Sequence, residues 1–466
     1  MIDQPSILQL VRFLSNYWPY LSVAGLLVGV AVSYKRLVDS ERRAQAEREQ
    51  TFFLSILYVF VKSGKTILQA LKEAAAKKEY VKHLSGVAAF LVRDAETRTL
   101  AGSMRGYVHP SREFTLLVGS LGEDLESGFG VVEKLEKLIE QAIVRETDRW
   151  RRYVETVETL GEVVVAVILL VPMVFIVGAL FGGFPMVYAV VIAVAAAVVF
   201  YVVAVASEPM HLIDLPRQIV IASTALAFGL GGALFLTFLG FAPIVIGLTV
   251  AVVSLAWGIF VHFNYVRKAV AEGEAAFLLL DSVAARLRAG YPIGKSLESV
   301  NDPRYSKYAL SVVRGLLIKP LNRFMSIALE TVRIARLGGL GAEALSLLAR
   351  LALAVYLSVT GARARMKLYT ALAIASGSAI IAVSAIAILP FTAFTQEVGV
   401  EVTRFITPPR LEPILPLSML VSYVLGITVS KVEDQTIAAF WRAGAGVLLS
   451  VFVYLVADAY LGVQAF

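Results

Sequence analysis

Two stretches of the chain combine a Gly-Lys pair with a hydroxyl side chain, a combination that binds phosphate groups in nucleotide-binding loops. They are residues 63–66, which read SGKT, and residues 290–296, which read GYPIGKS. A phosphate-binding loop also needs a glycine five positions before the Gly-Lys pair, and it must join a strand to a helix. Val59 and Ala289 occupy those positions, and both stretches follow helical patterns. The sequence therefore predicts glycine-terminated helix turns here rather than nucleotide binding.

Other patterns that would indicate catalysis or metal binding are missing from the sequence. There is no Cys, which excludes disulfides, thiolate zinc sites and cysteine nucleophiles. The four His residues are scattered, without the spacing that places two metal ligands on one helical face. No Gly-x-Ser-x-Gly nucleophile motif occurs, and the acidic residues from 133 to 140 alternate with lysines as on a solvated helix face. We therefore expect no catalytic residue, metal site, cofactor or enzyme activity.

The composition is that of a membrane protein. Of the 466 residues, 58% are hydrophobic and only 17% are charged. The net charge of +7 does not indicate nucleic-acid binding, because the excess of basic residues in the cytoplasmic parts of membrane proteins produces the same result. The lack of Cys and the low content of amides, with 10 Gln and 4 Asn, are typical of a thermophile.

Apolar stretches that approach or reach the roughly 20 residues needed to cross a bilayer recur along the chain. An interfacial amphipathic helix over 5–16 precedes the first of them, and the start of the chain does not resemble a signal peptide. Apart from boundary positions, the predicted spans contain no ionisable residue, unlike the spans of ion-coupled transporters. The eight predicted spans are Leu21–Tyr34, Val163–Phe181, Met186–Ala206, Gln218–Leu239, Ala242–His262, Leu368–Phe394, Ile414–Ser430 and Arg442–Val456.

Two charged blocks with helical periodicity interrupt these spans, which predicts an all-α, multispanning membrane protein of about eight spans with two repeated helical-bundle domains. Four spans separate the blocks, so both blocks lie on the same side of the membrane. The blocks hold 21 and 16 Lys and Arg, whereas the segments assigned to the opposite side hold only Arg404 and Arg410, so both blocks are predicted to be cytoplasmic and the protein to lie in the cell membrane. The five predicted parts are 1–34 (interfacial helix and first span), 35–159 (block one), 160–263 (four spans), 264–367 (block two) and 368–466 (three spans).

The two blocks share an order of motifs. A shift of 226 residues places Gly64 on Gly290 and aligns VKSGKTILQAL with LRAGYPIGKSL. A deletion of 15 residues in block two then places Gly128 on Gly339. Each block ends in a long predicted helix whose basic run precedes a span, a pattern that sets topology and attracts lipid phosphates.

This order of motifs resembles the type II secretion system F-domain family. The shared features are a helix, a Gly turn, a short helix that begins G-x-x-I-x-x-[AS]-L, and further amphipathic helices closed by a Gly-rich turn before a long helix enters the membrane. Two copies with spans between them are similar to the archaeal platform proteins of type IV-pilus-like machines and the archaellum. The resemblance covers roughly residues 50–180 and 275–395. It implies a dimeric platform that binds a hexameric secretion ATPase through its cytoplasmic domains and guides pilin-like subunits into a filament.

Block two is the predicted docking surface for that ATPase, because it holds 16 basic and 7 acidic residues, whereas block one holds 21 and 19. An alternative function is a permease subunit of an ATP-driven transporter, which would also contact an ATPase. Such permeases usually dock through short coupling helices, and blocks of this length do not fit that role. The candidate docking residues, which surround the helix breaks at Pro303 and Pro320, are Lys295, Arg304, Lys307, Arg314, Lys319 and Arg323.

Overall fold

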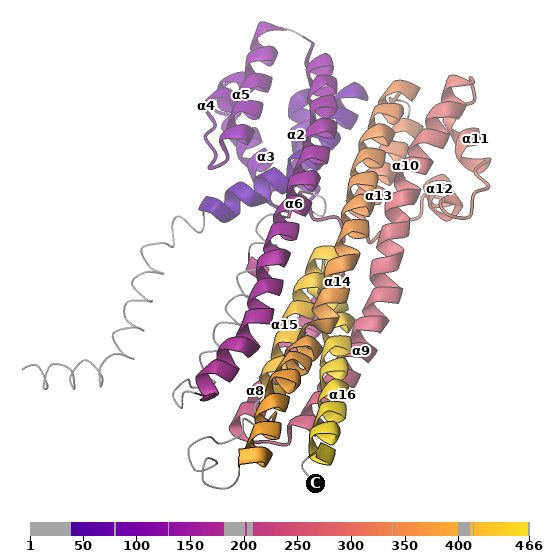
Figure 1. The fold of residues 1–466 in the computed structure, drawn as a ribbon. Coiled ribbons are helices and arrows are strands. Elements are labelled where there is room, and N and C mark those ends of the chain that lie inside the picture. The colour runs from indigo at the N-terminus through magenta and orange to yellow at the C-terminus, as the bar shows by residue number, and fades with distance from the viewer. Residues whose placement is uncertain are drawn as a thin grey trace, which may run out of the picture. The chain divides into compact units, whose positions relative to one another are not determined.

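The computed structural model describes residues 39–78, 81–128, 130–180, 201–202, 208–337, 339–398, 411–412 and 414–464. This part of the chain is all-helical, and its only β-type pairing is one antiparallel bridge between Ile213 and Asn322 (Figure 1). The first predicted span and the interfacial helix before it lie outside the described residues, as does almost all of the predicted span Met186–Ala206.

The described helices follow one another along the chain, most of them joined by short connections. Before residue 181 they are a helix over 39–62, α2 (Ile67–Ala76), α3 (Lys82–Asp94), α4 (Leu100–Gly106), α5 (Arg112–Ser127) and α6 (Val131–Leu180). After residue 207 they are α8 (Arg217–Leu236), η1 (Thr237–Leu239), α9 (Pro243–Val261), the π-helical turn η2 (His262–Val266), α10 (Arg267–Arg288), α11 (Ile293–Glu298), α12 (Ser306–Val313), α13 (Arg323–Arg336), α14 (Ala342–Val398), α15 (Ile414–Asp434), η4 (Ile437–Ala439) and α16 (Trp441–Gln464).

The chain forms two compact units. The first contains Met1–Phe53 and Leu71–Val131, and the second contains Leu54–Ala70 and Val132–Phe466. In the first unit, α3 begins at the buried carboxylate of Glu49, which accepts hydrogen bonds from the backbone N–H groups of His83 and Leu84 at 2.8 and 2.9 Å. A carboxylate at this end of a helix satisfies free N–H groups and interacts favourably with the helix dipole.

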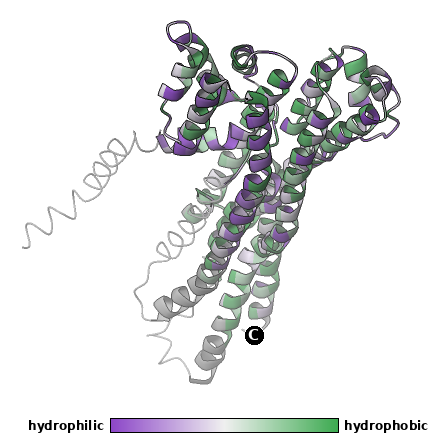
Figure 2. Cartoon of the chain, turned by 90° about the horizontal axis from the view of Figure 1, so that it is seen from above, coloured by the Kyte–Doolittle hydropathy of each residue, from purple (hydrophilic) through white to green (hydrophobic). Residues whose placement is uncertain are grey.

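Five helices in the described residues are long and apolar enough to cross a membrane, so the chain is a multi-pass membrane protein. They lie within Arg217–Leu236, Pro243–Arg288, Ala342–Ile386, Ile414–Asp434 and Ile437–Leu461. Each matches one predicted span, and the predicted span Val163–Phe181 falls in the last third of α6, outside these five. In Figure 2, hydrophobic residues predominate along the helices near the marked C-terminus.

Glycines allow the membrane helices of the second unit to pack closely. A Cβ atom on Gly258 of α9 would lie 2.1 Å from the backbone nitrogen of Trp441, at the start of α16. A Cβ atom on Gly426 of α15 would lie 2.3 Å from the Cα atom of Ala443. Helices in lipid associate largely through such close contacts, because burial of apolar surface gives little driving force there.

Two helices of block two continue directly into membrane spans. Residues 243–288 form one uninterrupted helical segment through α9, η2 and α10, and α14 runs for 57 residues from block two to Val398. The 22 residues of α10 extend for about 33 Å. The long helices α10 and α14 pack against each other, and α13 packs on α10.

The two Gly-Lys stretches follow the same kind of helix end. Gly64 and Gly290 have φ angles of +90° and +84°, in the left-handed region that favours glycine. Both turns make the same backbone hydrogen bonds, from Lys65 N to Phe60 O and from Tyr291 N to Arg286 O, each at 3.1 Å. The predicted glycine-terminated turns are therefore confirmed.

Candidate functional site at the base of block two

The turn between α15 and α16 contains a buried group of charges. Arg442, only 2% exposed, lies with Nη1 2.6 Å from Asp434 Oδ2 and with Nη2 2.9 Å from Glu433 Oε2. Glu433 and Asp434 end α15, where the helix dipole disfavours negative charge, and Arg442 begins α16, where it disfavours positive charge. The ion pairs therefore compensate for two unfavourable helix ends and hold the turn together.

Two further membrane helices reach this group. His262, in the π-helical turn that joins α9 to α10, has Nδ1 3.4 Å from Asp434 Oδ2. From α14, Arg363 Nε donates a hydrogen bond to the backbone carbonyl of Glu433 at 2.8 Å, and Thr370 donates to its carboxylate at 2.5 Å. The charged turn thus connects α9, α14, α15 and α16 at the level where α9 passes into block two.

The segment 208–216, which precedes α8, is fixed to the same turn. Glu208 is 5% exposed, and its carboxylate lies 2.8 Å from Lys431 Nζ and 3.4 Å from His211 Nδ1. Burial alone would raise the pKa of Glu208, but Lys431 and His211 lower it to about 2. This segment also pairs with the chain just before α13, through Asp214 N to Leu321 O at 2.7 Å.

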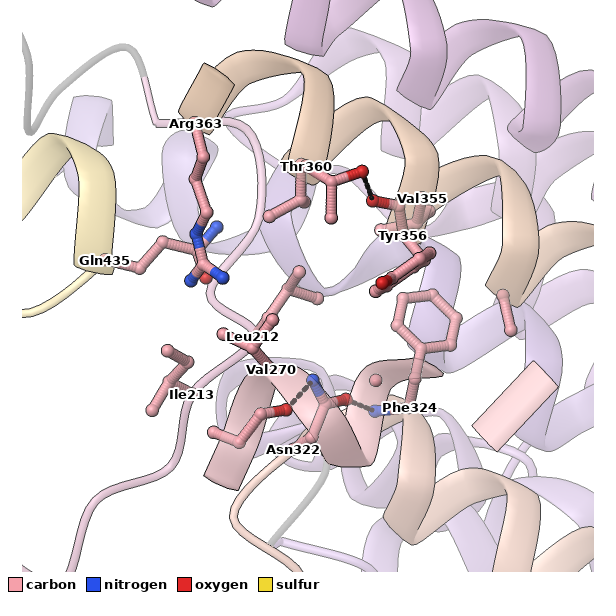
Figure 3. Close-up of a pocket in the computed structure, with 14 residues that line it drawn as sticks. Leu212, Ile213, Val270, Asn322, Phe324, Val355, Tyr356, Thr360, Arg363 and Gln435 are labelled. Carbon is pink, nitrogen blue, oxygen red and sulfur yellow. Dashed lines mark hydrogen bonds between the residues drawn. The ribbon is translucent and has the colours of Figure 1, made fainter. Parts of the chain in front are cut away.

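A small cavity lies beside these charges, between the starts of α10 and α13 and the side of α14. Gln435 has φ +56°, the only positive φ of a described non-glycine residue, and its buried amide makes no hydrogen bond. Figure 3 shows its side chain directed toward the guanidinium of Arg363, with Asn322 on the opposite wall. The cavity volume of about 20 Å³ suffices for one water molecule.

Glu272 of α10 organises the part of block two nearest this cavity. Its carboxylate accepts hydrogen bonds from Tyr308 Oη at 2.6 Å and from the backbone N–H groups of Leu321 and Asn322 at 2.6 and 2.9 Å. Burial and this carboxylate both raise the pKa of Tyr308. The start of α13 is therefore fixed to α10 as well as to the segment 208–216.

We call these charges the junction cluster, defined as Glu208, Arg363, Lys431, Glu433, Asp434 and Arg442. The cluster contains three carboxylates and three cations, so its formal charge is balanced. Buried ion pairs contribute little net stability, but removal of one partner is strongly destabilising because it leaves an uncompensated charge. The arrangement is therefore suited to fixing the position of block two on the membrane helices.

The six predicted docking residues differ in exposure and in their partners. Arg304 is already paired, at 2.6 Å with Asp302 and at 2.8 Å with Glu274, and these carboxylates raise its pKa. Arg323 is half-buried at the start of α13, and its Nε has no hydrogen bond. The other four, which are exposed, are Lys295, Lys307, Arg314 and Lys319.

The sequence analysis did not predict the junction cluster, nor did it predict a contact between two histidines. It treated Arg442 and His262 as span boundaries, although the charged run KVEDQ at 431–435, followed by Arg442, was a signal of charge at a buried helix turn. It also considered the histidines to be scattered, but His83 and His109 lie with their Nε2 atoms 3.1 Å apart. No sequence spacing indicated this contact, because 26 residues and α4 separate the two side chains.

Comparison of the chain with protein-family models, curated proteins and solved structures found no match.

Proposed function

We propose that the chain is the membrane platform of a machine that assembles type IV-pilus-like or archaellum filaments. In this proposal a cytoplasmic hexameric ATPase binds block two and moves it. The membrane helices then transmit the movement to pilin-like subunits. The platform works as a homodimer in the cell membrane, where its basic runs contact lipid phosphates, and it carries no nucleotide, metal or cofactor of its own.

One observation carries this proposal: the direct mechanical connection between block two and the membrane helices. Two helical segments pass from block two into the membrane helices without a break. The junction cluster fixes one of them, α14, to the turn between α15 and α16 through Arg363, and His262 of the other lies 3.4 Å from Asp434 in the same turn. Packed helices resist deformation, so a displacement of block two reaches the membrane helices instead of being absorbed by a flexible linker.

The helix starts support the two-block arrangement on which the resemblance to platform proteins rests. Arg112 and Arg323, the first residues of α5 and α13, are 211 residues apart, as are Val131 and Ala342, the first residues of α6 and α14. A separation of 211 is the shift of 226 reduced by the 15-residue deletion. Block one has two helices, α3 and α4, where block two has only α12, so the correspondence covers the helix starts on either side of this difference. A permease subunit would not require a second block with corresponding helix starts.

The proposal is tested by separating ATPase binding from filament assembly. Arg442→Met leaves Asp434 and Glu433 buried without their cation, which should lower the stability of the junction by about 3–5 kcal/mol. We expect the full-length variant to retain binding of the purified ATPase in nanodiscs and to lose filament assembly in cells.

Asp458→Asn, an exposed change later in α16, is the matched control and should behave as the unchanged protein. Retained ATPase binding, together with an unchanged yield of inserted protein, shows that Arg442→Met is folded. Normal filament assembly by a folded Arg442→Met protein would contradict the role of the junction, and failure of the unchanged protein to bind the ATPase would contradict the platform function itself.

A further inference from the structure

One loop of block two exposes three consecutive apolar side chains. Residues 314–319 read RGLLIK and connect α12 to α13. Leu316, Leu317 and Ile318 are 53%, 88% and 37% exposed, and the cations at the two ends of the segment are also exposed. Single exposed apolar residues are normal, but a run of three is unfavourable unless it serves binding. We call this segment the docking loop.

Arginines of α13 hold the backbone at the end of α12 and at the start of the docking loop. Arg333 Nη2 donates to the carbonyl of Leu316 at 3.1 Å, and Arg336 Nη1 donates to the carbonyls of residues 312–313 at 2.6 and 2.9 Å. Gly315 turns the chain with φ +69°, a conformation that a side chain would disfavour. Since these contacts fix the loop before any partner binds, the entropic cost of ordering it on binding is small.

The start of the docking loop contacts the end of α13 that is farther from the junction cluster. The start of α13 is tied to Glu272 and to the segment 208–216, close to the junction cluster. Arg333 follows Arg323 by ten residues, which places it about 15 Å farther along the helix. The carbonyl of Leu316, which Arg333 contacts, therefore lies toward the end of α13 that is farther from the membrane helices, where a soluble protein has access.

We propose that the docking loop is the principal contact of block two with a soluble protein whose apolar pocket is bordered by carboxylates. Leu317, the most exposed of the three apolar residues, enters the pocket, and desolvated apolar anchors of this kind dominate the affinity of interfaces. Arg314 and Lys319, at the two ends of the loop, pair with the carboxylates and direct the approach of the partner. The identification of that partner as the ATPase rests on the proposed function, whereas the chemistry of the surface does not.

Site-specific photocrosslinking of the full-length chain in its source cells tests the proposal. Benzoylphenylalanine replaces Leu317 or, as a matched control, Leu337, which is also 88% exposed and directly follows α13. We expect an adduct with one soluble protein at Leu317, with a yield about tenfold above that at Leu337, as for an anchor residue. Mass spectrometry should place the crosslink at an apolar site of the partner bordered by Asp or Glu.

Charge reversal provides the second measurement. Arg314→Glu with Lys319→Glu should lower the adduct yield at Leu317 about tenfold and leave the yield of inserted protein unchanged. An adduct with lipid or with a second copy of the chain, equal yields at both positions, or no adduct would overturn the docking proposal. A crosslink from Leu317 to an acidic protein other than the ATPase would support the docking role of the loop and contradict the proposed function. A crosslink of the ATPase only to other parts of block two would support the proposed function and contradict the docking role of the loop.

Discussion

At the scale of single residues, the contact between His83 and His109 fixes which nitrogen of each ring carries a proton. The backbone N–H of Ser111 donates to His109 Nδ1 at 3.1 Å, so this nitrogen must be unprotonated. Neutral His109 then carries its proton on Nε2 and donates it to His83 Nε2 at 3.1 Å. The pair therefore favours two neutral rings, and a metal ion shared by both Nε2 atoms would require the other tautomer of His109.

This pair should make the first unit sensitive to acid. Burial lowers the pKa of both histidines below the ordinary value of 6.5, the neighbouring histidine lowers that of His109 further, and Arg42 acts in the same direction on both. As pH falls, the histidines of the unfolded chain, which have the ordinary pKa, bind protons at a higher pH than those of the folded chain. The contribution of the pair to folding stability is therefore fully present above about pH 6.5 and is lost as pH falls through the lowered pKa values. We expect hydrogen-exchange protection of α3 and α5, corrected for the intrinsic rate, to decrease from pH 7.5 to 5.

His83→Gln with His109→Asn is the control for that experiment. Asn Oδ1 can replace Nδ1 as the acceptor for Ser111 N–H, and neither amide side chain takes up a proton between pH 7.5 and 5. Protection in this variant should not change over the same pH range. Equal acid sensitivity of the variant and the unchanged protein would show that other groups, such as Glu47 and Glu49, cause the effect.

At the scale of elements, the glycine contacts between membrane helices give a direct test of the packing. Gly258→Ala would place a Cβ atom against the backbone of Trp441, and overpacking of this kind costs about 1–3 kcal/mol. Gly232→Ala on α8 is the control, because its Cβ atom would meet nothing within 4 Å. We expect the thermal unfolding temperature in detergent to fall for Gly258→Ala only. Similar values for both variants would mean that α9 and α16 do not approach as closely as described.

The sequence predicts elements better than it predicts their contacts. Five predicted spans correspond to membrane-length helices because apolar length is a local property. The continuation of α14 through 57 residues is only partly predictable, since hydropathy marks the apolar part alone. The junction cluster was not predicted at all, because Glu208 and Lys431 are 223 residues apart and come together only when the membrane helices pack.

At the scale of the whole molecule, the segment 208–216 connects local contacts to membrane topology. It pairs with residues 321–323 of block two, so it must lie at the same end of the membrane helices as that block. The turn between α15 and α16 lies there as well, because Lys431 contacts Glu208. This arrangement agrees with the two predicted spans, Gln218–Leu239 and Ala242–His262, that separate the segment from block two. The orientation of the helices sets which face of the membrane that end occupies.

Single cysteines can determine that face, because the natural chain has none. Lys295→Cys marks block two, Arg217→Cys marks the exposed start of α8, and Thr403→Cys marks the segment between α14 and α15. If the excess of basic residues sets the orientation, a membrane-impermeant thiol reagent should label Thr403→Cys on intact cells and label the other two only after permeabilisation. Labelling of Lys295→Cys but not Thr403→Cys on intact cells would invert the topology. Different labelling of Lys295→Cys and Arg217→Cys would contradict the pairing of segment 208–216 with block two.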